Sequence, residues 1–259
     1  MIRVSEEAVS KAFEACRRRR PKWFGPEGLG LQLRMYVAAA RAFGESGQLE
    51  HFEDVYQGLK KWKVGRAGVL LPCKTVFERL TGLDPRLQKQ RLSALAPADW
   101  PMVWDALCRL KDVKQTKKGE PRVMAVSKFL HFWNPRLFVI CDQEEVEGFV
   151  FGHHWLKTQC EGVNVARHVG EAAVAREPSL EGYLKVLALA SEFVKANPHI
   201  LPEFAWTVRS LVGGAAVPAD IETYEATAAE WCLVGLAEMP PAGVEMPRTH
   251  ADRTAEVKP

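Results

Sequence analysis

The sequence predicts an all-α protein, and three observations support this prediction. Apolar residues recur at spacings of three and four through most of the chain, which is the period of an amphipathic helix. No series of alternating strands is present, and the apolar run Leu137–Cys141 is too short to build a sheet. A chain of 259 residues, 47% hydrophobic and 26% charged, has the composition of a globular protein with a sizeable core.

The first predicted helix runs from Ser5 to about Arg20. It ends in four consecutive arginines followed by Pro21, and basic residues at a helix C-terminus interact favourably with the helix dipole. A loop rich in glycine and proline follows and carries Trp23 and Phe24. These aromatic residues suit either a wedge or stacking wall for an extruded base, or an anchor that fixes the loop to the core.

The later predicted helices share the same amphipathic pattern. They span residues 31–43, 49–62, 73–80, 85–95, 99–110, 122–133, 178–196, 202–212 and 220–236. Residues 239–259 contain several prolines and few apolar residues, so we expect a disordered tail there. The sequence therefore predicts one folded domain over residues 1–238 and a C-terminal tail over residues 239–259.

Composition excludes several classes of protein. No apolar run approaches the roughly 20 residues of a membrane span, and Met1–Glu7 lacks the apolar core of a signal peptide. The six cysteines show no Cys-x-x-Cys spacing, so we expect reduced cytoplasmic thiols and no metal site. No nucleotide-binding glycine motif is present, and we expect no cofactor.

Charge is distributed unevenly along the chain. Residues 1–130 contain 25 Lys+Arg and 14 Asp+Glu, a net of +11, whereas residues 131–259 contain 10 and 18, a net of −8. A basic half of this kind favours a polyanion such as DNA. The alternative is that these residues only cover solvated helix faces.

The most informative segment is residues 121–147. It contains a predicted amphipathic helix, a turn with a proline, the apolar run Leu137–Cys141 and then Asp142. Glu145 stands three residues after Asp142, as in a capping box at a helix start. Backbone N–H groups and the helix dipole would hold the Asp142 side chain as a carboxylate, which can stabilise a developing positive charge. An N-cap aspartate can also serve the helix alone.

The motif Ser127–Phe132, followed by Pro135, Leu137–Phe138 and Asp142, resembles the helix-hairpin-helix DNA glycosylase superfamily. It is most similar to the divergent, 8-oxoguanine-glycosylase-like bacterial branch. The resemblance covers the hairpin and catalytic segment, at about residues 117–147. It implies a two-lobed helical fold with a DNA-binding cleft between the lobes.

The resemblance also implies roles for individual residues. The expected catalytic residue is Asp142, with Lys128 as a second candidate. The expected DNA-binding residues are Lys117, Lys118, Gly119, Arg122, Arg19, Arg20 and Lys22. The expected residues of a base pocket or wedge are Trp23, Phe24, His131, Trp133 and His153.

The sequence departs from the superfamily pattern in three places. The Leu-Pro-Gly-x-Gly hairpin is absent and only Gly119 remains. Arg122 stands nearest the Schiff-base lysine of bifunctional members, and a guanidinium cannot form an imine. The cysteines that hold an iron–sulfur cluster in some members are missing. The arginine at position 122 favours a monofunctional enzyme.

The expected function is therefore a DNA glycosylase that extrudes a damaged or modified base from double-stranded DNA and hydrolyses its N-glycosidic bond. We expect a monomer with no membrane partner. The divergent hairpin motivates a further hypothesis, that the enzyme acts in phage defence against modified-base DNA. Two alternatives remain open: a non-catalytic helical DNA-binding protein with this fold, and a helical interaction or toxin–antitoxin module in which Asp142 is only a cap.

Overall fold

A computed structural model shows that the protein is mostly helical, which confirms the predicted all-α class. The structure describes residues 2–25, 27–44, 47–64, 68–115, 123–141, 166–212 and 217–239, and the backbone of Val244–Glu245. The strands within these ranges are all two residues long. None of the described helices is both long and apolar enough to cross a bilayer.

The helices follow the predicted order closely. They are α1 (Glu6–Arg19), α2 (Leu29–Ala42), α3 (Leu49–Lys61), α4 (Cys73–Thr81), α5 (Pro85–Lys89), α6 (Trp100–Leu110), α7 (Val123–Trp133), α9 (Ala166–Val169), α10 (Glu171–Val174), α11 (Pro178–Ala196), α12 (Ile200–Val212) and α13 (Glu225–Glu238). Short 3₁₀ helices are η1 (Leu92–Ala94), η2 (Pro97–Asp99) and η4 (Ile221–Thr223). The strands are β1 (Arg3–Val4), β2 (Val69–Leu70), β3 (Lys114–Gln115) and β4 (Val244–Glu245).

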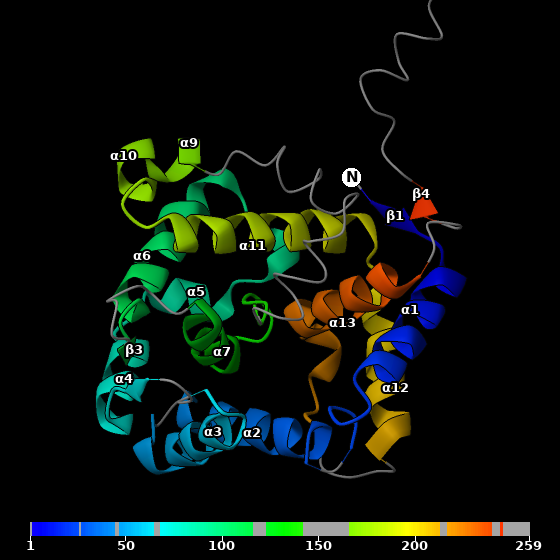
Figure 1. The fold of residues 1–259 in the computed structure, drawn as a ribbon, viewed down its shortest axis with the longest axis horizontal. Coiled ribbons are helices and arrows are strands. Elements are labelled where there is room, and N and C mark those ends of the chain that lie inside the picture. The colour runs from blue at the N-terminus through cyan, green and yellow to red at the C-terminus, as the bar shows by residue number, and fades with distance from the viewer. Residues whose placement is uncertain are drawn as a thin grey trace, which may run out of the picture.

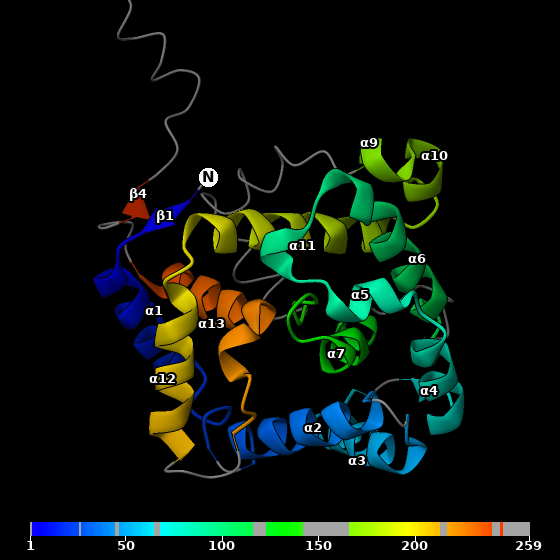
Figure 2. The ribbon, with the colours of Figure 1, turned by 180° about the vertical axis from the view of Figure 1, so that it is seen from behind.

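Helix α7 lies at the centre of the molecule, between the α2–α3 pair and α11 (Figures 1 and 2). Helices α1, α12 and α13 gather on one side of it, and α4, α5 and α6 lie on the opposite side. A single cluster of buried apolar residues runs through all of these groups, from Ile2 in the N-terminal segment to Ala237 in α13. The central helix is therefore surrounded by elements from both halves of the sequence.

The two ends of the described chain are joined by α1 and α13. A Cβ atom on Gly235 would stand 1.7 Å from the carbonyl oxygen of Ala12, so only glycine lets the two backbones approach this closely. Strands β1 and β4 also pair antiparallel. Residues 244–245, which fall in the predicted tail, are thus paired with the N-terminal strand.

The apolar run after α7 is buried. Every residue of Leu137–Cys141 is at most 3% exposed. The Tyr183 hydroxyl donates a hydrogen bond to the carbonyl of Val139 at 2.6 Å, and the backbone N–H of Cys141 donates to Ser127 Oγ at 3.0 Å. The run is therefore fixed against α11 on one side and against α7 on the other.

The helix predicted over residues 85–95 is wrong in its length. Helix α5 ends at Lys89, and Gln90 is extended with ψ 149° before η1 begins. The side-chain amide of Asn134 donates to the carbonyls of Leu87 and Gln90, at 2.6 and 2.9 Å. A contact with the turn after α7 thus takes the carbonyl groups that a continuing helix would have used.

Candidate nucleic-acid interface

A cavity of about 310 Å³ opens where the loop after α1, the end of α3 and α7 meet. We call it the lysine–tryptophan pocket. Its lining residues are Lys22, Trp23, Glu27, Gly28, Lys61, Trp62, Lys63 and Lys128. It unites three residues that the sequence predicts for the site, Lys22, Trp23 and Lys128.

Two tryptophans form one wall of the pocket. The Trp23 and Trp62 rings lie 5.1 Å apart between centroids and are tilted by 36°. Lys128 Nζ stands 5.8 Å from the Trp62 ring centroid, within the range of a cation–π contact. Both tryptophans are half-buried, so each keeps part of its surface exposed.

Lysines supply the charge of the pocket. Lys22, Lys61 and Lys63 are exposed, and none of them forms an ion pair with any residue in the part of the chain that the structure describes. Glu27 contributes one opposing carboxylate. Lysine charges beside aromatic faces are the chemistry by which proteins bind nucleic-acid strands, because the lysines neutralise phosphate and the rings stack on bases.

The start of α2 fixes the Trp23 loop. A Cβ atom on Gly28 would lie 2.2 Å from the Trp23 carbonyl oxygen and 2.5 Å from that of Lys22, so glycine is required for this approach. The Gly28 N–H donates to the carbonyl of Gly25 at 3.0 Å. On the other side, the Arg20 guanidinium stands 5.0 Å from the Trp23 ring centroid.

The end of α3 fixes Trp62 and Lys63. Lys63 N–H donates to the carbonyl of Lys60 and Val64 N–H donates to that of Leu59, at 2.9 and 3.1 Å, which is the Schellman pattern of a helix end. Lys63 has a φ of 59°, in the left-handed region where glycine is favoured. A strained lysine therefore lies at the rim of the pocket.

Lys128 connects the pocket with the buried run. Its side chain lines the cavity, although the residue is only 3% exposed. Its neighbour Ser127 accepts the hydrogen bond from Cys141, the last described residue before Asp142. The segment that leads to the predicted catalytic aspartate is thus anchored one residue from the pocket lysine.

The predicted N-terminal DNA contacts divide into two kinds. Lys22 is exposed in the pocket, whereas Arg20 is buried and pairs with Glu230 at 3.0 Å. That burial leaves Arg20 no surface for a phosphate, and its guanidinium instead supports the Trp23 ring. Arg19, at the end of α1, forms an ion pair with Glu238.

Three predicted pocket or wedge residues lie elsewhere. Phe24 packs edge-on against Trp231, with centroids 4.7 Å apart, and so anchors the loop to the core. His131 is fully buried, and burial lowers its pKa to about 4. Trp133 lines a different cavity, together with Phe132.

The remaining predicted site residues lie outside the described ranges. They are Asp142, Lys117, Lys118, Gly119, Arg122 and His153.

Sequence reasoning did not assign Trp62, Lys61 or Lys63 to the site. The signal was present, because residues 60–66 mix positive charge with an aromatic side chain and a glycine. That mixture is common in solvated loops, and only the fold shows that Trp62 meets Trp23.

Together, the fold and the pocket define a mostly helical protein with a basic cavity walled by tryptophans. Comparison with protein-family models, curated proteins and solved structures finds no match to this chain.

Proposed function

We propose that this protein is a DNA glycosylase that hydrolyses the N-glycosidic bond of a damaged or modified base extruded from double-stranded DNA. The observation that carries the proposal is the lysine–tryptophan pocket beside Ser127, which anchors Cys141 immediately before Asp142 in the sequence. On this proposal the pocket would receive the flipped nucleotide, and the segment that precedes Asp142 in the sequence is anchored at α7, one residue from Lys128.

Binding would begin with the exposed lysines. Lys22, Lys61 and Lys63 would neutralise backbone phosphates on either side of the target nucleotide, releasing counterions. An extruded base could then stack on Trp23 or Trp62, which offsets part of the cost of unstacking it from the duplex. The proposal includes the two-lobed arrangement, with the duplex lying across the face that carries the pocket.

The chemical step requires a carboxylate near C1′ of the sugar. The bond between C1′ and the base nitrogen breaks, the leaving base takes the electron pair and a proton, and water oxygen bonds to C1′. Asp142 would stabilise the cationic sugar and accept a proton from that water. Lys128 is assigned a supporting role, because its ammonium group lies against Trp62 and can contact the bound nucleotide.

The test is the formation of abasic sites. Wild type and Asp142→Asn are incubated with base-modified and ordinary oligonucleotides and phage genomes, and abasic sites are then cleaved with alkali. Asp105→Asn is the matched control, because Asp105 is an exposed residue of α6 paired with Arg109. We expect strand breaks with wild type and with the control, and none with Asp142→Asn. Equal breakage by all three proteins would remove Asp142 from the chemistry.

One observation also favours a second function, a non-catalytic DNA-binding protein. The lysines and tryptophans of the pocket are all binding groups, and they need no carboxylate chemistry to hold a strand. This alternative predicts salt-dependent DNA binding that survives Asp142→Asn and no abasic product from any form. A complete lack of salt-dependent DNA binding would instead favour a helical interaction module.

A further inference from the structure

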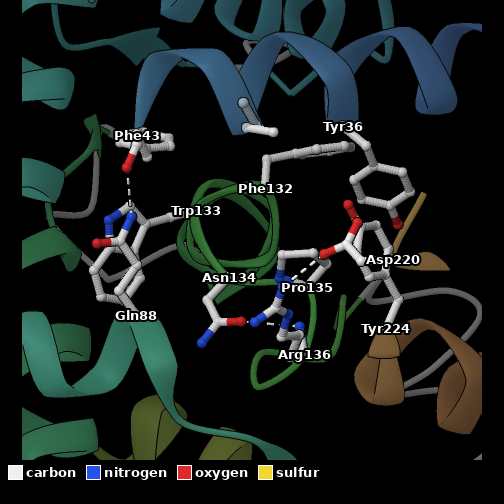
Figure 3. Close-up of a pocket in the computed structure, with 12 residues that line it drawn as sticks. Tyr36, Phe43, Gln88, Phe132, Trp133, Asn134, Pro135, Arg136, Asp220 and Tyr224 are labelled. Atoms are coloured by element: carbon white, nitrogen blue, oxygen red, sulfur yellow. Dashed lines mark hydrogen bonds and ion pairs between the residues drawn. The ribbon is translucent and has the colours of Figure 1, made fainter. Parts of the chain in front are cut away.

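A second cavity, of about 260 Å³, is lined in part by Phe132, whose ring also contacts Trp62 of the first pocket (Figure 3). We call it the aromatic pocket. It is lined by Tyr36, Ala39, Ala40, Phe43, Gln88, Phe132, Trp133, Asn134, Pro135, Arg136, Asp220 and Tyr224. These residues come from α2, α5, α7, the turn after α7 and the segment before α13, so the pocket draws on elements far apart in the sequence.

Five of its twelve lining residues are aromatic. The Tyr36 ring lies 5.1 Å from that of Phe132 and 4.9 Å from that of Tyr224, between centroids, and the second pair is edge-on at 78°. Trp133 is 6% exposed, and Figure 3 shows it on the opposite side of the pocket from the two tyrosines. Rings arranged in this way favour a flat, apolar-faced ligand.

An ion pair between Arg136 and Asp220 lies on the tyrosine side of the same cavity. Arg136 Nη2 donates to Asp220 Oδ2 at 2.6 Å, and both side chains remain partly exposed, at 32% and 43%. Burial, followed by the charge of Asp220, raises the pKa of Tyr224, so its phenol stays protonated. The pocket therefore offers a carboxylate acceptor and a guanidinium donor side by side.

Beyond the bond between Arg136 and Asp220 and a side-chain hydrogen bond between Tyr224 and Asp220, this pair keeps capacity for a ligand. A carboxylate has about four lone-pair sites and a guanidinium has five N–H donors. Within the described ranges, Arg136 makes no side-chain hydrogen bond besides the one to Asp220. A ligand with adjacent N–H donors and a neighbouring acceptor would satisfy both groups together.

We propose that the aromatic pocket binds a neutral, guanine-type purine. The N1–H and 2-amino groups of guanine match the Asp220 carboxylate, and O6 and N7 are acceptors for arginine. Adenine has an unprotonated N1 on that edge, which a carboxylate repels. The cavity is smaller than the roughly 300–1,000 Å³ of drug-sized ligand sites, so it fits a base more readily than a whole nucleotide. This proposal does not depend on glycosylase activity.

The experiment is calorimetric titration of the full chain with 9-ethylguanine and 9-ethyladenine. We expect 9-ethylguanine to bind and 9-ethyladenine to bind at least about tenfold more weakly, as the loss of charge-assisted hydrogen bonds requires. Asp220→Asn should reduce the affinity for 9-ethylguanine by about tenfold or more, whereas Asp105→Asn should leave it unchanged.

A second variant separates binding from folding. Ala40 is an exposed residue of α2 that lines the pocket, so Ala40→Phe should fill the cavity without disturbing the core. We expect it to abolish binding while the urea unfolding midpoint stays at the wild-type value. Equal affinity for the two purines would overturn the proposal, and so would retained binding of 9-ethylguanine by Ala40→Phe. It would also be overturned if neither purine probe nor the pentanucleotide TTGTT bound at millimolar concentration.

Guanine edges occur on free bases and in nucleic acid. Titration with the pentanucleotide TTGTT distinguishes these two sources. Binding of 9-ethylguanine assigns the pocket to a free base. Binding of TTGTT alone, if lost in Ala40→Phe, assigns it to guanine within a strand. Failure of this proposal is distinguishable from failure of the glycosylase, because Asp142→Asn leaves the aromatic pocket intact.

Discussion

Replacement of Lys63 by glycine should stabilise the fold and weaken the binding of DNA. Lys63 follows the end of α3 with a φ of 59°, where a side chain is strained and glycine is not. The hydrogen bonds of this helix end use only backbone atoms, from Lys63 to Lys60 and from Val64 to Leu59. Glycine can therefore keep both bonds while removing the strain.

The expected gain in stability is small but measurable. The left-handed conformation costs a residue with a side chain roughly 1–2 kcal/mol. Glycine loses more conformational entropy on folding than lysine does, and this loss offsets roughly 0.5–1 kcal/mol of the gain. The difference spans roughly 0–1.5 kcal/mol and centres on a gain of about 0.75 kcal/mol, which raises the melting temperature of a chain of this size by about 2 °C.

DNA binding should change in the opposite direction. Lys63 is an exposed charge at the rim of the lysine–tryptophan pocket. If Lys63 contacts a phosphate, its removal should make the negative slope of log affinity against log salt concentration less steep by about 1. Fluorescence anisotropy with labelled duplex at several salt concentrations measures this slope.

Lys61→Gly is the matched control. Lys61 lines the same pocket but is the last residue of α3 itself. Glycine there should cost up to about 1 kcal/mol of stability, while it removes the same charge. The two variants should thus lose DNA affinity alike and move in opposite directions in urea unfolding. If Lys63→Gly is no more stable than wild type, the argument from backbone strain is wrong. An unchanged salt slope would show that Lys63 does not meet phosphate.

Three further predictions follow from the same structure. Trp62→Ala should weaken DNA binding roughly tenfold, as the loss of one stacked base predicts, whereas Trp206→Ala, 65% exposed on α12, should not change the anisotropy titration. Ser127→Ala removes the hydrogen bond that the backbone N–H of Cys141 donates to Ser127 Oγ and should cost about 0.5–1.5 kcal/mol in urea unfolding; it should also slow abasic-site formation while DNA binding persists. Burial lowers the pKa of His131 from 6.5 to about 4, so the folded state disfavours the proton that the unfolded chain accepts. Stability should therefore be full above pH 6.5 and fall by about 3 kcal/mol on acidification to pH 4, a dependence that His131→Gln should flatten.

Local sequence patterns predict the helices well where the helix depends on its own residues. The helix predicted over residues 178–196 is observed as Pro178–Ala196, because Pro178 suits a first turn and the apolar period is strong. The apolar run Leu137–Cys141 is buried, as the apolar character of its residues favours. The segment 85–95 fails because Asn134, far along the chain, binds the carbonyls of Leu87 and Gln90, which a continuing helix would have used. A local pattern carries no information about such a partner.

The site is harder to predict, because its side chains meet only after folding. Trp23 and Trp62 are 39 positions apart, and no periodicity relates them. Arg20 looks like a surface charge in the run of four arginines. Its burial requires Glu230, which is 210 residues away in the sequence. Residue types can thus indicate nucleic-acid chemistry, but which charges remain exposed is decided by tertiary pairing.

The buried polar contacts of His131 explain how α7 can hold both pockets in fixed positions. His131 Nδ1 lies 2.6 Å from the carbonyl of Phe138, which can only accept, so this nitrogen carries the proton. Nε2 must then accept from the Tyr36 hydroxyl, also at 2.6 Å. A single neutral tautomer satisfies both bonds, and it ties α7 to α2 and to the buried run at once. Lys128 lies one turn before His131 and Phe132 directly after it, so the same bonds fix the lysine of one pocket and an aromatic ring of the other.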